Sequence, residues 1–87
     1  MITREIQINN ATGLHLRPAG LFCKEAIKFR SNVLFQYENG EYNAKSVLSV
    51  LGACVKSGDS IVLLIDGTDE QDAMQAMVNL IESGIGE

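Results

Sequence analysis

The sequence predicts an α+β fold in which four antiparallel strands form one sheet and three helices cover one of its faces. Two observations support this prediction. In four short segments the apolar residues follow the pattern of a β-strand, in most of them with a period of two. In three other segments the apolar residues recur at helical spacing. Because each strand and each helix then has an apolar side, one layer of helices on one sheet face buries all of them. The expected order along the chain is β-α-β-β-α-β-α.

The first three elements are a strand, a helix and a second strand. Residues 3–9 alternate, with Ile6 and Ile8 on one face, and predict a half-buried strand. Pro18 opens the helix, because proline is tolerated in a first turn where its missing N–H costs no hydrogen bond. Residues 33–37 alternate again and predict the second strand. The buried stripe of the helix is expected to contain Ala19, Phe22, Cys23, Ala26 and Ile27.

A hairpin and a short helix follow. Asn39-Gly40 favours a type I′ turn that returns the chain into a third strand over residues 42–44. Ser46 is a preferred N-cap and predicts a short helix after it. The apolar residues of this helix are Val47, Leu48, Val50 and Leu51.

The last two elements are a strand and a helix. Residues 61–65 are apolar throughout, which predicts a strand at the centre of the sheet. Asp69 and the acids after it suit the positive end of the last helix, and Gly84 suits the position after its end. The buried stripe of this helix is expected to contain Met74, Met77, Val78 and Ile81. Three apolar residues, Leu34, Val62 and Leu64, fall on the other sheet face and are expected to be partly exposed.

Length and composition limit the function. The 87 residues predict a single domain, residues 1–87, without a cleft between domains, so any chemistry must take place at the surface. Cys23 and Cys54 have neither disulfide nor metal spacing, and one histidine argues against zinc, so no metal or cofactor is expected. The chain shows no signal-peptide pattern and no apolar run near the ~20 residues that span a bilayer. We expect a cytoplasmic protein with reduced thiols and no membrane insertion.

Charge is unevenly distributed along the chain. Residues 1–56 hold all seven Lys and Arg residues and four acids, whereas residues 57–87 hold seven acids and no base. The acidic last part argues against nucleic-acid binding. The basic first part favours an acidic protein partner or an anion.

Residues 13–19, Gly-Leu-His-Leu-Arg-Pro-Ala, place the only histidine, His15, just before a predicted helix. Unpaired N–H groups and the helix dipole make a helix start an anion site, and the guanidinium of Arg17 suits phosphate. A phosphoryl group on an imidazole nitrogen could be held here without a deep pocket. The alternative is that both residues are simply solvated. Histidine is not a preferred N-cap, which counts against that alternative.

Together with Lys45-Ser46-Val47, this motif resembles the phosphorylation-site signature of HPr, the histidine-containing phosphocarrier family of the bacterial phosphoenolpyruvate-dependent sugar phosphotransferase system. The resemblance covers essentially the whole chain and implies an open-faced β-sandwich. It implies that His15 accepts a phosphoryl group on Nδ1 from enzyme I and passes it to enzyme IIA components, while Arg17 holds the phosphate. Such a protein is a carrier and not an enzyme.

The resemblance also implies a second phosphorylation site. In Gram-positive members the serine matching Ser46 is phosphorylated by an ATP-dependent HPr kinase/phosphorylase, and a catabolite-control regulator is a further partner. A phosphate adds about −1.5 to −2 charges, here at a helix start. A plain N-cap role for Ser46 is the alternative, and the two roles are compatible. Leu48, Ser49 and Leu51 depart from the pattern of the Gram-positive regulatory members, and Leu16, Gly20 and Cys54 depart from the commonest pattern of the family.

A docking patch around the histidine is the last feature that the resemblance implies. Its residues are Leu16, Lys24, Val47, Leu48 and Leu51. A short helix cannot bury all its apolar residues on one side, so we expect Val47 or Leu48 to be exposed, as is typical of contact sites. Cys54 is expected to be a buried, inert thiol. A carrier that presents His15 to two successive partners is expected to be a monomer.

Three other functions are weighed against the carrier. A regulatory paralogue that acts only through phospho-Ser46 in catabolite repression is one, since the family includes members that lack the active histidine; His15 argues against it here. A small nucleic-acid or protein adaptor is another, but the few aromatic residues and the acidic last part argue against nucleic acid. A hydrolase is the weakest, because there is no second histidine, triad or cleft.

Overall fold

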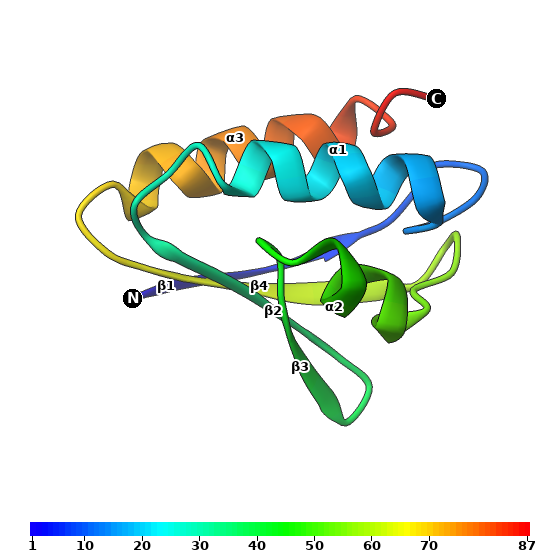
Figure 1. Ribbon diagram of the computed structural model, residues 1–87, viewed down its shortest axis with the longest axis horizontal. Coiled ribbons are helices and arrows are strands. Elements are labelled where there is room, and N and C mark those ends of the chain that lie inside the picture. The colour runs from blue at the N-terminus through cyan, green and yellow to red at the C-terminus, as the bar shows by residue number, and fades with distance from the viewer.

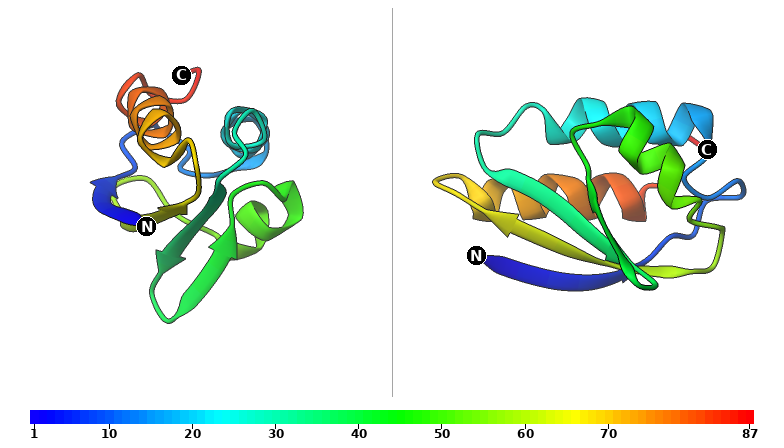
Figure 2. Two further views of the ribbon diagram at one scale, coloured as in Figure 1. Left: turned by 90° about the vertical axis from the view of Figure 1, so that its left-hand side faces the viewer. Right: turned by 60° about the horizontal axis from the view of Figure 1, so that its bottom comes forward.

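The computed structural model describes residues 1–87 and contains seven elements in the predicted order. They are β1 (Ile2–Gln7), α1 (Leu16–Ala26), β2 (Asn32–Tyr37), β3 (Gly40–Asn43), α2 (Val47–Ala53), β4 (Ser60–Asp66) and α3 (Glu70–Glu82). The strands form one antiparallel sheet of order β1-β4-β2-β3. Figures 1 and 2 show that all three helices lie on one face of this sheet, with α1 and α3 side by side. The predicted fold class is confirmed.

The central strand of the sheet is built as its sequence predicts. β4 lies between β1 and β2, and its residues Ile61, Leu63 and Ile65 are at most 1% exposed beneath the helices. Each such side chain contributes about 1.5–3 kcal/mol to stability through its burial. Leu34, Val62 and Leu64 are half-buried on the open face, as expected.

Aromatic contacts join α1 to the hairpin. The ring of Phe22 meets Phe35 edge to face, with centroids 5.7 Å apart, and Phe35 stacks on Tyr42 at 5.4 Å. Pairs of this kind add about 0.5–1.5 kcal/mol to the burial of the rings themselves. The contacts fix the position of α1 over β2 and β3, and therefore the position of the start of α1.

Two local predictions are wrong. The hairpin turn consists of Glu38 and Asn39, because Tyr37 pairs with Gly40, and Glu38 rather than Gly40 has a left-handed φ, 54°. Glycine at position 40 serves another purpose, since a Cβ there would collide with the ring and hydroxyl of Tyr42. Ile27 was expected in the buried stripe of α1, but the helix ends at Ala26 and Ile27 is 58% exposed at its C-cap.

Candidate functional site

His15 lies at the N-cap of α1, at the end of the loop that leads from β1. The backbone is held on both sides of it. The N–H of the buried residue Leu14 donates to the carbonyl of Val55 at 3.0 Å, and the N–H of Ala19 donates to the carbonyl of His15 at 2.7 Å. The imidazole itself is exposed and makes no capping hydrogen bond. The ring is thus fixed at its base and accessible from solution.

Gly13 lets the loop before His15 lie close to the segment that follows α2. Its φ is 68°, in the left-handed region that glycine adopts most easily. A Cβ at this position would collide with the carbonyl oxygen of Val55 and lie 2.8 Å from the backbone nitrogen of Ser57. The glycine is therefore required for the contact that brings His15 next to α2.

The first turn of α1 supplies the groups that can bind an anion. Leu16 and Arg17 are exposed, whereas Pro18 and Ala19 are buried and anchor the turn. The N–H groups of Leu16 and Arg17 come before the first intrahelical donor, so they are free to bind an anion that approaches the helix start. The start of α1 therefore carries an exposed imidazole, two free N–H donors and the guanidinium of the exposed residue Arg17. It can accept and hold a phosphoryl group.

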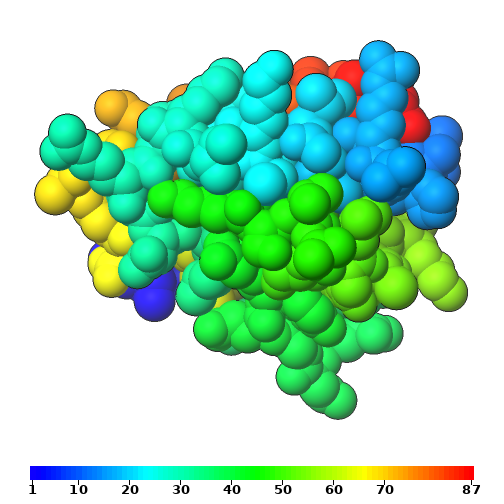
Figure 3. All heavy atoms as spheres, viewed as in Figure 1, coloured from blue at the N-terminus to red at the C-terminus, as the bar shows by residue number.

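The start of α2 is tied to α1, and to the segment that follows α1, by two hydrogen bonds of Lys45. Its Nζ donates to the carbonyl of Phe29 at 2.7 Å, and its own carbonyl accepts the Cys23 thiol at 3.1 Å. The hydroxyl oxygen of Ser46 accepts the N–H of Ser49 at 3.2 Å, which confirms the predicted N-cap. Figure 3 shows α2 packed directly against α1 on the face turned to the viewer.

Exposed apolar side chains lie on the first turn of α1 and on α2, which packs against α1. Leu16 is 66% exposed, Leu48 79% and Val47 38%, while Leu51 is half-buried. Both candidates for exposure on α2 are therefore exposed, which confirms that expectation. Lys24 is exposed in the last turn of α1. An apolar surface of this kind on two adjoining helices is typical of a protein-contact site.

A shallow hollow of about 310 Å³ lies beside the histidine. Its lining residues are Thr12, Leu14, His15, Leu51, Cys54, Val55 and Lys56. The expectation of a buried Cys54 is wrong, because the residue is exposed and lines this hollow. Cys54 follows the last residue of α2 with a left-handed φ of 57°, and this reversal of the chain directs the side chain away from the core.

Asn10, Thr12 and Glu87 were not singled out from the sequence. The Glu87 carboxylate accepts hydrogen bonds from Asn10 and Thr12, on the loop that leads to His15. The Thr12 hydroxyl, followed by Asn10, holds the pKa of Glu87 below its usual range. An Asn-x-x-Gly sequence at residues 10–13 is a weak signal of a side-chain-stabilised turn. Nothing in the sequence pairs that turn with a residue 75 positions away.

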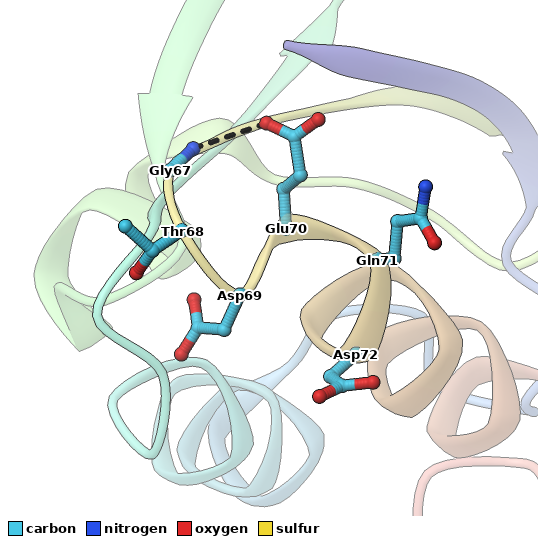
Figure 4. A pocket seen from close by; sticks show the side chains of 6 residues that line it. All are labelled: Gly67, Thr68, Asp69, Glu70, Gln71 and Asp72. Carbon is cyan, nitrogen blue, oxygen red and sulfur yellow. Dashed lines mark hydrogen bonds between the residues drawn. The ribbon is translucent and has the colours of Figure 1, made fainter.

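A larger hollow of about 460 Å³ lies at the start of α3, at the opposite end of the molecule from the start of α1 (Figure 1). Figure 4 shows its six lining residues, which include Asp69, Glu70 and Asp72. Three carboxylates repel a phosphate, so this hollow is unsuited to the chemistry expected of His15.

No three His, Cys, Asp or Glu side chains come close enough together to hold a metal ion. No helix has the length and apolar character needed to cross a bilayer.

Comparison with known proteins places these features in one family. Residues 2–83 match the family described as "PTS HPr component phosphorylation site". The chain is 37% identical over 82 residues to the HPr-like protein Crh of Halalkalibacterium halodurans, covering 94% of this chain and 98% of that protein. It is 36% identical over 87 residues to the phosphocarrier protein HPr of Xylella fastidiosa, covering 100% and 98%. The crystal structure of HPr-C-His from Thermoanaerobacter tengcongensis superposes with a TM-score of 0.96 at 42% identity, covering 100% and 98% of the two chains.

Proposed function

The chain belongs to the HPr family of the phosphotransferase system, and on that premise we propose that it is a cytoplasmic phosphocarrier that uses His15. In this proposal His15 accepts a phosphoryl group from enzyme I and passes it to enzyme IIA components. The supporting observation is the exposed imidazole at the start of α1, held only through its backbone. A side chain that must meet two partners in turn needs this combination of a fixed base and an accessible ring.

The transfer is a displacement at phosphorus. An imidazole nitrogen of His15, Nδ1 in the family, bonds to phosphorus while the bond to the nitrogen of the phosphohistidine on enzyme I breaks. The donor histidine leaves with the electron pair of that bond. The N–H groups of Leu16 and Arg17, with the Arg17 guanidinium, stabilise the charge on the phosphoryl oxygens. The same steps in reverse order deliver the group to enzyme IIA.

The partners supply what a domain of this size lacks. The site is open and lies on two helices, so enzyme I and enzyme IIA must cover the phosphoryl group themselves. The docking surface in this proposal consists of Leu16, Val47 and Leu48, with Leu51 at its edge and Lys24 as a contact for acidic residues. The protein is a phosphorylated intermediate in the chain of transfers and acts as a monomer.

Intact mass measurement tests the carrier role. The protein is mixed with enzyme I and phosphoenolpyruvate and its mass is recorded before and after mild acid, which removes phosphate from histidine. One phosphate that appears and is then lost supports the proposal, since the chain has a single histidine. His15→Ala is expected to stay folded and to remain unmodified. A His15→Ala variant that still gains an acid-labile phosphate would rule out the site assignment.

A second candidate function is regulation through phospho-Ser46, which the similarity to Crh favours. Ser46 lies half-buried at the start of α2, with its hydroxyl oxygen accepting the N–H of Ser49. Treatment with ATP and an HPr kinase tests this role, because a phosphoserine survives mild acid. A chain that gains an acid-stable phosphate at Ser46 and none at His15 is a regulator and not a carrier.

A further inference from the structure

The segment Ser83–Glu87, which follows α3, folds back over the loop that carries His15. Oε1 of Glu87 accepts the Nδ2 amide of Asn10 at 3.1 Å and the backbone N–H of Thr12 at 3.2 Å. Oε2 accepts the Thr12 hydroxyl at 2.7 Å. Figure 2 shows this end of the chain beside the start of α1. One carboxylate therefore binds three donors on a loop that lies more than 70 residues earlier in the sequence.

Backbone hydrogen bonds hold this segment against the end of α3. The N–H of Ile85 donates to the carbonyl of Leu80 at 3.2 Å, and the N–H of Glu87 donates to the carbonyl of Gly84 at 3.0 Å. Gly84, Ile85 and Gly86 have successive φ values of 90°, 48° and 80°, and a β-branched residue in the left-handed region is strained. Burial of Ile85, which is only 1% exposed, opposes that strain. The hydrogen bonds of the Glu87 side chain add a direct link from this segment to the loop before the histidine.

The residues that Glu87 binds lie on the loop that leads to His15. Asn10 is 5% exposed, and its Nδ2 also donates to the carbonyl of Gly13 at 2.8 Å, while its Oδ1 has no hydrogen-bond partner. All the hydrogen bonds of this buried side chain are therefore made by its amide nitrogen, to Glu87 and to Gly13. Thr12 lines the same hollow as His15. Both residues that Glu87 binds thus lie within five positions of the histidine.

We propose that Glu87 is a positioning residue for His15, acting through Asn10 and Thr12 to hold the loop in the form that presents the ring to phosphorylated partners. The proposal rests on the carrier function proposed above. In this proposal Glu87 acts through its hydrogen bonds to the loop and not through contact with the phosphoryl group or a partner. Its loss should therefore slow the transfer step and leave docking unchanged, because Leu16 and Leu48 are undisturbed.

Single-turnover phosphorylation by phospho-enzyme I tests the proposal. Glu87→Ala is expected to lower the maximal rate by about threefold to tenfold, with the concentration of enzyme I at half-maximal rate unchanged within about twofold. Glu82→Ala, which removes a carboxylate in the last turn of α3, is the matched control and should behave as the wild type. Glu87→Gln keeps an acceptor oxygen and should restore part of the rate. A Glu87→Ala variant with the wild-type rate overturns the proposal.

A double variant tests the route through the loop. Thr12→Val removes the hydroxyl donor to Glu87, and the double variant Glu87→Ala/Thr12→Val is expected to be no slower than Glu87→Ala alone. If the rate of the double variant falls by the product of the two single-variant effects, Glu87 does not act through Thr12.

Nuclear magnetic resonance of the His15 ring separates this proposal from the carrier function. The ring signals are expected to shift in Glu87→Ala and to stay in place in Glu82→Ala, whether or not phosphate is transferred. Unshifted ring signals would overturn the positioning role. A wild-type protein that takes no phosphate would instead overturn the carrier function.

Discussion

Asp69, at the N-cap of α3, binds Ser31 twice, through the backbone N–H of the serine at 2.9 Å and its hydroxyl at 2.5 Å. Its second oxygen accepts the N–H of Arg30 at 2.9 Å. In Figure 4 the Asp69 side chain points away from Glu70, which turns back to the Gly67 N–H. One carboxylate therefore joins the α1–β2 loop to the start of α3, at the opposite end of the molecule from His15.

Replacement of this carboxylate is expected to lower stability without affecting phosphate acceptance. Asp69→Ala leaves the hydroxyl of Ser31, which is 1% exposed, and two N–H groups without their acceptor. In a domain of this size the loss should lower the Tm by about 5 °C or more. Thermal unfolding followed by circular dichroism measures the effect, and an unchanged Tm would contradict it.

The same carboxylate makes stability depend on pH in acid. The Ser31 hydroxyl, together with the Arg30 N–H, lowers the pKa of Asp69 to about 2. A group whose pKa is lower in the folded state contributes fully above its unfolded pKa of about 3.9 and loses that contribution as pH falls towards the folded value. The difference in unfolding free energy between wild type and Asp69→Ala should therefore shrink between about pH 4 and pH 2. Urea titrations at several pH values measure it, and a difference independent of pH would be contrary to this expectation.

The phenol of Tyr37 is expected to ionise only at high pH. Its hydroxyl donates to Asp59 at 2.5 Å, and this bond, followed by burial and the charge of Asp59, raises the pKa of Tyr37 to about 12. The bond stabilises the fold below the unfolded pKa near 10, and that contribution is lost as pH rises towards 12. The variant Tyr42→Phe leaves Tyr37 as the only tyrosine, so absorbance at 295 nm follows it alone. A midpoint near 10, or one that Asp59→Asn fails to lower, would count against the bond.

Two glycines near the site should respond in opposite ways to the same substitution. Gly13→Ala places a Cβ against backbone atoms of Val55 and Ser57 at a φ of 68°, and is expected to cost about 2 kcal/mol or more and to slow phosphate acceptance. Gly20→Ala adds a methyl group with nothing within 4 Å inside α1, and should stabilise by up to about 1 kcal/mol. Urea unfolding of both variants checks the signs, and equal effects would contradict the close approach at Gly13.

The sequence was sufficient to predict the fold because its patterns are local. The apolar run at 61–65 placed β4 at the centre of the sheet, and Ser46 marked the start of α2. The hairpin turn was misplaced because Asn39-Gly40 carries a strong turn signal, whereas in the structure Gly40 begins β3 and a Cβ there would meet the Tyr42 ring. Such a contact depends on how side chains pack in the folded protein, and it produces no periodic pattern in the sequence.

The surroundings of the histidine were harder to predict than the histidine itself. The motif at residues 13–19 indicated His15 and Arg17, and both lie at the start of α1. The exposure of Cys54 depends on a left-handed backbone at one residue, which no composition signal specified. The bonds of Glu87 to the loop join opposite ends of the printed sequence, and such pairs appear only once the chain is folded.

The exposed leucine of α2 is expected to matter for docking and not for folding. Leu48 is 79% exposed, so Leu48→Ser should change the free energy of unfolding by no more than about 0.5 kcal/mol. Loss of its apolar contact should raise the enzyme I concentration at half-maximal phosphorylation rate severalfold and leave the maximal rate unchanged. Ile27→Ser, at the far end of α1 and 58% exposed, is the matched control and should leave both quantities unchanged. Equal effects of the two variants would mean that enzyme I does not bind the surface around His15.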